Sequence, residues 1–191
     1  MNTLSSLKNH LLIAMPALED ENFSKTVTYI CEHNEEGAMG LILSVPIDIA
    51  FKEVVEQVDK AVLDGTLIDT IDDIPVYLGG PVEPEHGFVL HTPQGEWTSS
   101  MKLSEKLVLT TSSDIISAIA MGNGPDHYIV ALGYAGWGAG QLEQEIAENS
   151  WLSVPADMTQ LWDISPAERW SKAEALLGID LRSISNDVGH A

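Results

Sequence analysis

The stretch VTYICEHNEEGAMGLILS, residues 27–44, decides the fold class of this chain. Two strand-like apolar runs, 27–33 and 39–44, flank the turn Asn34–Gly37, in which glycine supplies the left-handed conformation that a tight turn needs. The pattern predicts a β-hairpin. A doubly wound parallel sheet needs helices between nearly all of its strands, and a hairpin breaks that rule. We therefore expect an α+β fold with a mixed, largely antiparallel central sheet and helices packed around it, with a curled or barrel-like form left open.

The rest of the chain alternates short strand patterns with helical ones. Apolar runs bounded by turn residues predict further strands at 11–15, 75–78, 88–92, 98–103 (an edge), 107–111, 128–132 (central) and 151–154. Helical patterns occupy 49–58, 115–121 and the stretch that ends at about Asn149, whereas 59–73 should hold an irregular turn or short helix. Ser112, Ser113 and Asp114 supply N-cap chemistry to the second of these helices.

The last predicted helix spans 166–177 and ends at Gly178. It opens with Ser165-Pro166-Ala167-Glu168, a capping box with proline at the first helical position. Trp162 and Trp170 flank and enter this helix, and we expect them to dock it on the sheet. The length of 191 residues fits one domain, 1–191, that includes this helix.

The charge balance limits the classes of partner. The chain has 29 Asp and Glu against 9 Lys and Arg, a net charge of -20, and no basic residue occurs in 61–101 or in 107–168. Because nucleic-acid binding depends on Lys and Arg that displace counterions, direct binding to DNA or RNA is disfavoured, and so is binding to anionic membranes. The acidity either aids solubility or selects a basic protein partner.

Cysteine content and hydropathy indicate a soluble cytoplasmic protein. The single cysteine, Cys31, allows no internal disulfide bond. Residues 1–10 lack the basic start and apolar core of a signal peptide, and no segment approaches the ~20 apolar residues that span a bilayer. We expect no membrane association, and the sequence does not indicate an oligomeric state.

The stretch GYAGWGAGQLEQEI, residues 133–146, looks most like a site. Glycines follow a predicted strand and precede a helix, as in phosphate-binding turns. The dinucleotide fingerprint fails, however, because Gln141 stands where glycine or alanine is needed, and the P-loop lysine is missing. Glu143 and Glu145 in the first helical turns would also repel a phosphate. No cofactor is indicated.

Two interpretations of this motif remain. Gly136, Gly138 and Gly140 let the chain turn tightly from strand to helix, and let one backbone approach another. Alternatively, the corner carries a binding surface built around an exposed Trp137, with Gln141 as a polar handle.

This motif also carries a family resemblance. The stretch GYAGWGAGQLEQEIAENSWL closely resembles the signature of the AlgH-like family, also called YqgE-like, and two further blocks agree with it: FSKTVTYICEHNEEGAMGLILS at 23–44 and VYLGGPV at 76–82. The blocks occur in the family's order from residue 11 to about 154. The resemblance implies a compact α+β bacterial cytoplasmic protein of unestablished biochemical role. Some members are labelled transcriptional regulators, and no catalytic residues are established that could be carried over.

Other reactive residue types give weaker patterns. Cys31 and His33 lie two apart on a predicted strand and should share one face, either as an activated thiol or as ordinary strand residues with a buried cysteine. The His and carboxylate run EPEHGFVLH, residues 83–91, is expected to be a loop and lacks zinc-ligand spacing, so no metal site is predicted. Ser112 and Ser113 lack the G-x-S-x-G context of a nucleophile elbow.

These observations favour a non-enzymatic regulatory or protein-interaction module, and any transcriptional role would be indirect. The alternative is an enzyme or small-ligand binder with a pocket between the turn Gly79-Gly80 and the glycines at 136–140, joined by Cys31 or His33. A DNA-binding regulator rests on the family label alone, and the charge opposes it.

Overall fold

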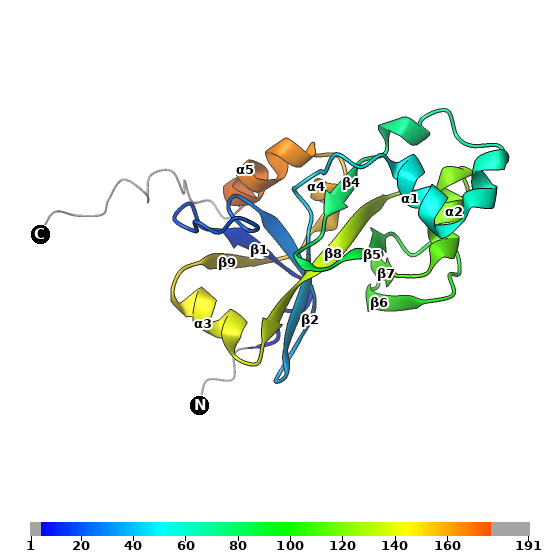
Figure 1. Ribbon diagram of the computed structural model, residues 1–191. Helices are drawn as coiled ribbons and strands as arrows, with labels where there is room; N and C mark the ends of the chain where they lie inside the picture. The colour runs from blue at the N-terminus through cyan, green and yellow to red at the C-terminus, as the bar shows by residue number, and fades with distance from the viewer. Residues whose placement is uncertain (1–4, 177–191) are drawn as a thin grey trace, which may run out of the picture.

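The computed structural model describes residues 5–176, and its centre is a nine-stranded sheet (Figure 1). The strand order is β6-β7-β5-β8-β3-β2-β1-β9, and β4 pairs with β8 off this path. Of the strand pairs in these residues, only β4 with β8 is parallel. The fold is therefore α+β on a mixed, largely antiparallel sheet, as expected, and the sheet is curled into a half-barrel. The strands are β1 (His10–Ala14), β2 (Val27–Asn34), β3 (Gly37–Ile42), β4 (Val76–Leu78), β5 (Val82–His91), β6 (Ser100–Ser104), β7 (Leu107–Thr110), β8 (Tyr128–Gly138) and β9 (Trp151–Pro155).

The hairpin of β2 and β3 confirms the prediction made from residues 27–44. Gly37, which ends its turn, has a φ of +140°, and a Cβ there would lie 2.1 Å from the carbonyl oxygen of Trp137. Glycine is thus required both by the turn and by the close passage of β8. The pairing register shifts between Ile30 and Glu32, which marks a β-bulge in β2.

Strand β8 is central, as expected, but it is longer than the predicted 128–132. Its first half pairs with β4 and β5, and its second half pairs with β3 through the glycine motif. In Figure 1 it runs diagonally between the two ends of the molecule. Strand β5 also exceeds its prediction: the stretch Glu83–Gly87, expected to be a loop, belongs to the strand. A register shift between Val82 and Gly87 leaves Pro84, which has no N–H group, in an irregular part of the ladder.

Helices cover both ends of the sheet (Figure 1). Helices α1 (Phe51–Val58) and α2 (Ser113–Ala120) pack together at one end, near the short 3-10 helices η1 (Lys60–Asp64) and η2 (Ile71–Asp73). Helix α3 (Gln141–Ala147), α4 (Met158–Leu161) and α5 (Pro166–Leu176) lie at the other end. The helices predicted at 49–58 and 115–121 are confirmed within a few residues. Ser112 is the N-cap of α2, but its side chain donates to Asp114 rather than capping the helix.

The curled sheet buries apolar side chains on both of its faces. On β1, Leu11 and Ile13 belong to one cluster, which we call the first core cluster. Helices α4 and α5 cover it through Leu161 and Ala173. Leu12 and Ala14 alternate onto the opposite face, into a second cluster beneath α3. The two faces therefore have separate cores.

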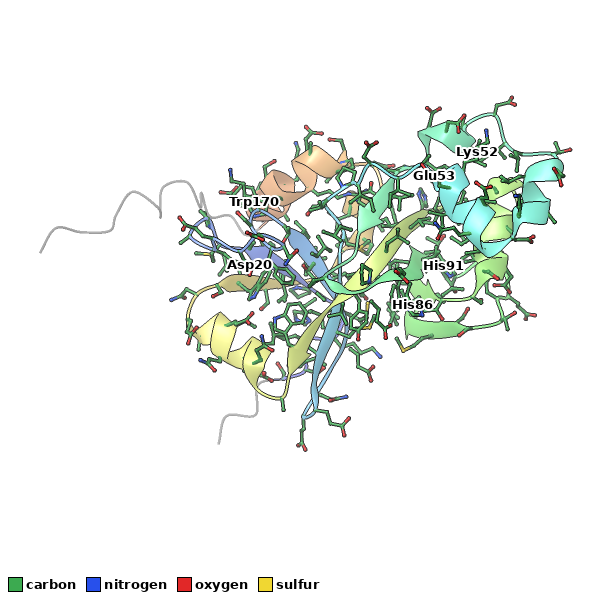
Figure 2. The ribbon with its side chains drawn as sticks, viewed as in Figure 1. Asp20, Lys52, Glu53, His86, His91 and Trp170 are labelled. Atoms are coloured by element: carbon green, nitrogen blue, oxygen red, sulfur yellow. The ribbon has the colours of Figure 1, made fainter. Side chains whose placement is uncertain are left out.

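The last helix contacts the sheet through its tryptophan. The indole N–H of Trp170 (Figure 2) donates to the carbonyl of Ala14 at 2.9 Å. Trp162 and Trp170 both pack against the first core cluster. At the start of α5, the hydroxyl of Ser165 donates to the Glu168 carboxylate at 2.7 Å. The predicted helix end at Leu177 and Gly178 lies outside the described residues. In residues 5–176, none of the helices combines the length and apolarity needed to cross a bilayer.

Candidate functional site

Trp137, which only the binding-surface interpretation required to be exposed, is buried, and this contradicts that interpretation. Its exposed fraction is 6%, and it packs with Phe23 and Trp151 under α3. Strand alternation turns Trp137 to the same face as Ala135. Its indole N–H donates to Oε2 of Glu145 at 2.9 Å. The tryptophan therefore anchors α3 to the sheet.

Gln141, which the binding-surface interpretation assigned to ligand contact, instead forms hydrogen bonds within the strand-to-helix corner. Its Oε1 accepts the Gly138 amide at 3.0 Å, and its Nε2 donates to Oε1 of Glu145 at 2.9 Å. Gly140 precedes α3 in the left-handed region, with a φ of +73°. These contacts favour the interpretation of Gly136, Gly138 and Gly140 as a tight corner.

The second glycine pair, Gly79 and Gly80, marks a close crossing of two backbones. A Cβ on Gly79 would lie 2.1 Å from the Gly133 carbonyl oxygen, and one on Gly80 would lie 2.0 Å from the Tyr134 carbonyl carbon. No side chain fits there. The turn at 79–80 therefore lies directly against β8. Neither Gly79 nor Gly80 is among the described residues that line the surface hollow at Gly136.

A hollow of about 690 Å³ lies between the β2–β3 hairpin, the start of β5 and the second half of β8. We call it the hairpin hollow. Gly136 and Trp137 are among its lining residues, whereas Gly138, Gly140 and Gln141 are not. A Cβ added to Gly136 would meet Tyr134 and Val82 only at ordinary distances, 3.5 and 3.8 Å, so this glycine leaves open space.

The lining of the hairpin hollow combines carboxylates with apolar side chains. The carboxylates are Glu32, Glu36 and Glu83, and the apolar side chains are Met39, Val82, Phe88 and Tyr134. Among residues 5–176, no lysine or arginine lines the hollow. Phe88 and Tyr134 pack edge to face, 5.7 Å between centroids. Sequence reasoning considered Glu83 only within the run 83–91 and did not connect it with Glu32 and Glu36, because only the fold brings the hairpin and β5 together.

Cys31 and His33 do not share a face, contrary to expectation. The bulge at Ile30/Glu32 turns Cys31 into the first core cluster, where its exposed fraction is 0%. His33 instead contacts Leu7 and α3. Burial raises the pKa of the Cys31 thiol to about 12. The thiol is therefore protonated at neutral pH and fits the buried-hydrophobe interpretation.

His33 links three segments of the chain. Its Nδ1 accepts the backbone N–H of Leu7 at 2.9 Å, which places the ring proton on Nε2. Nε2 then donates to Oε1 of Glu143 at 2.8 Å. The pKa of the Glu143 carboxyl is lowered, chiefly by its own backbone amide at the start of α3; burial opposes this effect, and the hydrogen bond and charge interaction with His33 lower the pKa further. This contact, unforeseen from sequence, fixes the hairpin to α3.

The His and carboxylate run of β5 does not converge on one point. His86 is exposed, 3.5 Å from Glu83, whereas His91 is buried (Figure 2). Nε2 of His91 bonds Thr110 at 2.8 Å and Nδ1 bonds the Thr92 carbonyl at 2.7 Å. Burial lowers the pKa of His91. Within residues 5–176, no three His, Cys, Asp or Glu side chains gather as metal ligands would.

Comparison with known proteins places this architecture in a family. Residues 11–182 match the family described as AlgH-like. The chain is 53% identical to a UPF0301 protein of Thioalkalivibrio sulfidiphilus and 48% identical to one of Nitrosococcus oceani, with all of each chain covered. The solution structure of the AlgH protein from Pseudomonas aeruginosa is 45% identical and matches with a TM-score of 0.78, over 100% of this chain and 99% of that one. A crystal structure from Corynebacterium diphtheriae, 22% identical with a TM-score of 0.72, covers 95% of this chain and 92% of its own and shares the fold. The chain belongs to the AlgH-like family.

Proposed function

We propose that the chain is a non-enzymatic protein-interaction module of the cytoplasm, and that the hairpin hollow takes a basic segment of a partner protein. The observation that carries this proposal is the composition of the hollow. Glu32, Glu36 and Glu83 line it together with apolar side chains, and none of the lysines and arginines in the described part of the chain does. Such a surface complements a segment that alternates basic and apolar residues.

The physical contributions to binding have different sizes. The net charge of -20 accelerates encounter with basic partners and slows encounter with polyanions. Each exposed ion pair at the rim adds only ~0–1 kcal/mol. Burial of apolar atoms against Met39, Val82 and Tyr134 supplies most of the affinity, at ~25 cal/mol per Å². Charge thus selects the partner and apolar contact retains it.

A role in transcription would follow indirectly from such binding. The same charge that favours basic proteins opposes direct contact with operator DNA. A regulatory effect of this chain therefore passes through the protein that occupies the hairpin hollow.

A glycine substitution provides the test. Gly136→Leu should occupy part of the hollow, because Gly136 lines it and an added Cβ has room. Gly87→Ala is the matched control, since a Cβ there meets nothing within 4 Å and Gly87 does not line the hollow. Affinity capture from lysate with each variant should retain a basic protein on the wild type and on Gly87→Ala, and lose it on Gly136→Leu.

Charge neutralisation tests the electrostatic part separately. Glu32→Gln, Glu36→Gln and Glu83→Gln together should weaken capture and reduce its salt dependence. The control removes the same charge elsewhere, at the exposed residues Glu19, Glu21 and Glu96. If all variants melt like the wild type and capture the same proteins equally, the hairpin hollow is not the interaction site.

A further inference from the structure

A second hollow, of about 570 Å³, lies where the segment before β4, the start of β8 and the start of α5 meet. We call it the Arg169 hollow. It shares no residue with the hairpin hollow. The side chains that matter for the argument are Asp73, Tyr77, Asp126, Trp162, Asp163 and Arg169.

Arg169 is a buried cation with unused hydrogen-bonding capacity. Its exposed fraction is 4%, its Nη1 donates to the carbonyl of Leu43, and its Cζ lies 5.1 Å from the centre of the Tyr77 ring. Its Nε is buried and has no hydrogen-bond partner among the described residues. Within the part of the chain that the structure describes, no Asp or Glu forms an ion pair with it.

This arrangement is unusual for arginine in folded proteins. Buried charges are normally paired, because an unpaired ion loses its hydration without compensation. Guanidinium has five N–H donors in a planar fork that matches a carboxylate. A chain with 29 acidic residues leaves this one buried arginine without an ion pair in residues 5–176. The guanidinium therefore retains capacity to pair with an anion from outside the described fold.

The other side chains of the hollow narrow the class of anion. Asp73, Asp126 and Asp163 are exposed at the same hollow, so a multiply charged phosphate would be repelled. The same carboxylates would attract an ammonium group. Trp162, stacked on His127 at 5.6 Å and 18°, adds an aromatic wall for an apolar side chain. A volume of this size accommodates a small metabolite.

We propose that the Arg169 hollow binds a free α-amino acid. The carboxylate of the ligand pairs with the Arg169 guanidinium, its ammonium group faces Asp73, Asp126 and Asp163, and its side chain lies along Trp162. This inference is independent of the proposed interaction at the hairpin hollow.

The test compares three probes of matched shape on the full chain: L-phenylalanine, phenethylamine, which lacks the carboxylate, and 3-phenylpropionate, which lacks the ammonium group. L-Leucine and L-lysine extend the series, and inorganic phosphate serves as the anion alone. Binding is followed by calorimetry and by the NMR signals of Arg169 Nε and Trp162 Nε1. L-Phenylalanine or another amino acid should shift both signals, and should bind at least ~10-fold more tightly than either truncated probe or phosphate.

Substitutions test separately the residue that pairs with the ligand carboxylate and the residues that face its ammonium group. Arg169→Lys keeps the charge but loses the planar fork, and should weaken amino-acid binding ~10-fold or more. Lys172→Met, at an exposed position on the same helix, is the control and should leave binding unchanged. Asp73→Asn with Asp163→Asn should weaken amino-acid binding while leaving 3-phenylpropionate unaffected or strengthening it.

The wild-type titrations decide the question even where a substituted protein fails to fold. Absence of binding by all the amino acids would overturn the proposal. So would equal binding of L-phenylalanine, phenethylamine and 3-phenylpropionate, or phosphate binding as tight as that of the amino acid. Unchanged binding by a folded Arg169→Lys variant would also overturn it.

Discussion

The indole N–H groups of Trp137 and Trp151 meet at one atom, Oε2 of Glu145, at 2.9 Å each. The two rings pack edge to face, 6.1 Å apart. Oε1 of the same carboxylate accepts a third hydrogen bond, from Gln141. The glycine motif and the tryptophan that follows α3 are thus joined through one carboxylate, which fixes α3 to β8 and β9.

Glu145 should therefore be a main support of this corner. Glu145→Ala leaves two indole N–H groups without their acceptor and should lower the free energy of unfolding by about 2–4 kcal/mol, measured by urea denaturation. Glu148→Ala, at the exposed C-cap position of α3, removes a single contact with Gln144 and should cost less than about 1 kcal/mol. Equal losses for the two variants would contradict this role for Glu145.

The decrease in the free energy of unfolding at acidic pH should depend on Glu143. Its pKa is lowered in the folded state, so its stabilisation is present above the unfolded pKa of ~4.3 and is lost as the pH falls through the folded pKa. Urea midpoints measured from neutral pH downward should fall less steeply for Glu143→Gln than for the wild type. Parallel curves would show that the Glu143 carboxylate carries no pH-dependent stabilisation.

The thiol of Cys31 should resist modification in the folded protein. Its pKa of about 12 leaves almost no thiolate at pH 8, and its sulfur is enclosed by the first core cluster. Alkylation by iodoacetamide, followed by mass spectrometry, should be slow without denaturant and rapid in concentrated urea. Rapid labelling of the native protein would revive the reactive-thiol interpretation.

The sequence predicted the hairpin and α1, whose structure depends on residues that are close together in the chain. The turn before Gly37 and the apolar stripe of 49–58 each depend on neighbours in sequence, so the hairpin and α1 could be read directly. The antiparallel character of the sheet followed from the same hairpin.

The errors concern contacts between distant segments. Flanking glycines made Trp137 look free, but α3 folds back over it and Glu145 takes its N–H group. A single extra residue at the bulge placed Cys31 and His33 on opposite faces, and a bulge has no signature in this stretch. The Arg169 hollow was missed because Arg169, on α5, contacts Tyr77, which lies 92 residues earlier in the sequence (169 − 77).

The crossing of Gly79 and Gly80 over β8 should be intolerant of any side chain. Gly79→Ala places a Cβ 2.1 Å from the Gly133 carbonyl oxygen, and Gly80→Ala places one 2.0 Å from the Tyr134 carbonyl carbon. Both obstacles are backbone atoms of the central strand, which cannot move without breaking its pairing with β4 or β5. Each substitution should lower the free energy of unfolding by more than about 3 kcal/mol, or prevent folding. Gly87→Ala, whose Cβ meets nothing within 4 Å, should change it by less than about 1 kcal/mol. Thermal melting of the three variants side by side makes the comparison, and a stable Gly79→Ala protein would mean that the two backbones do not touch.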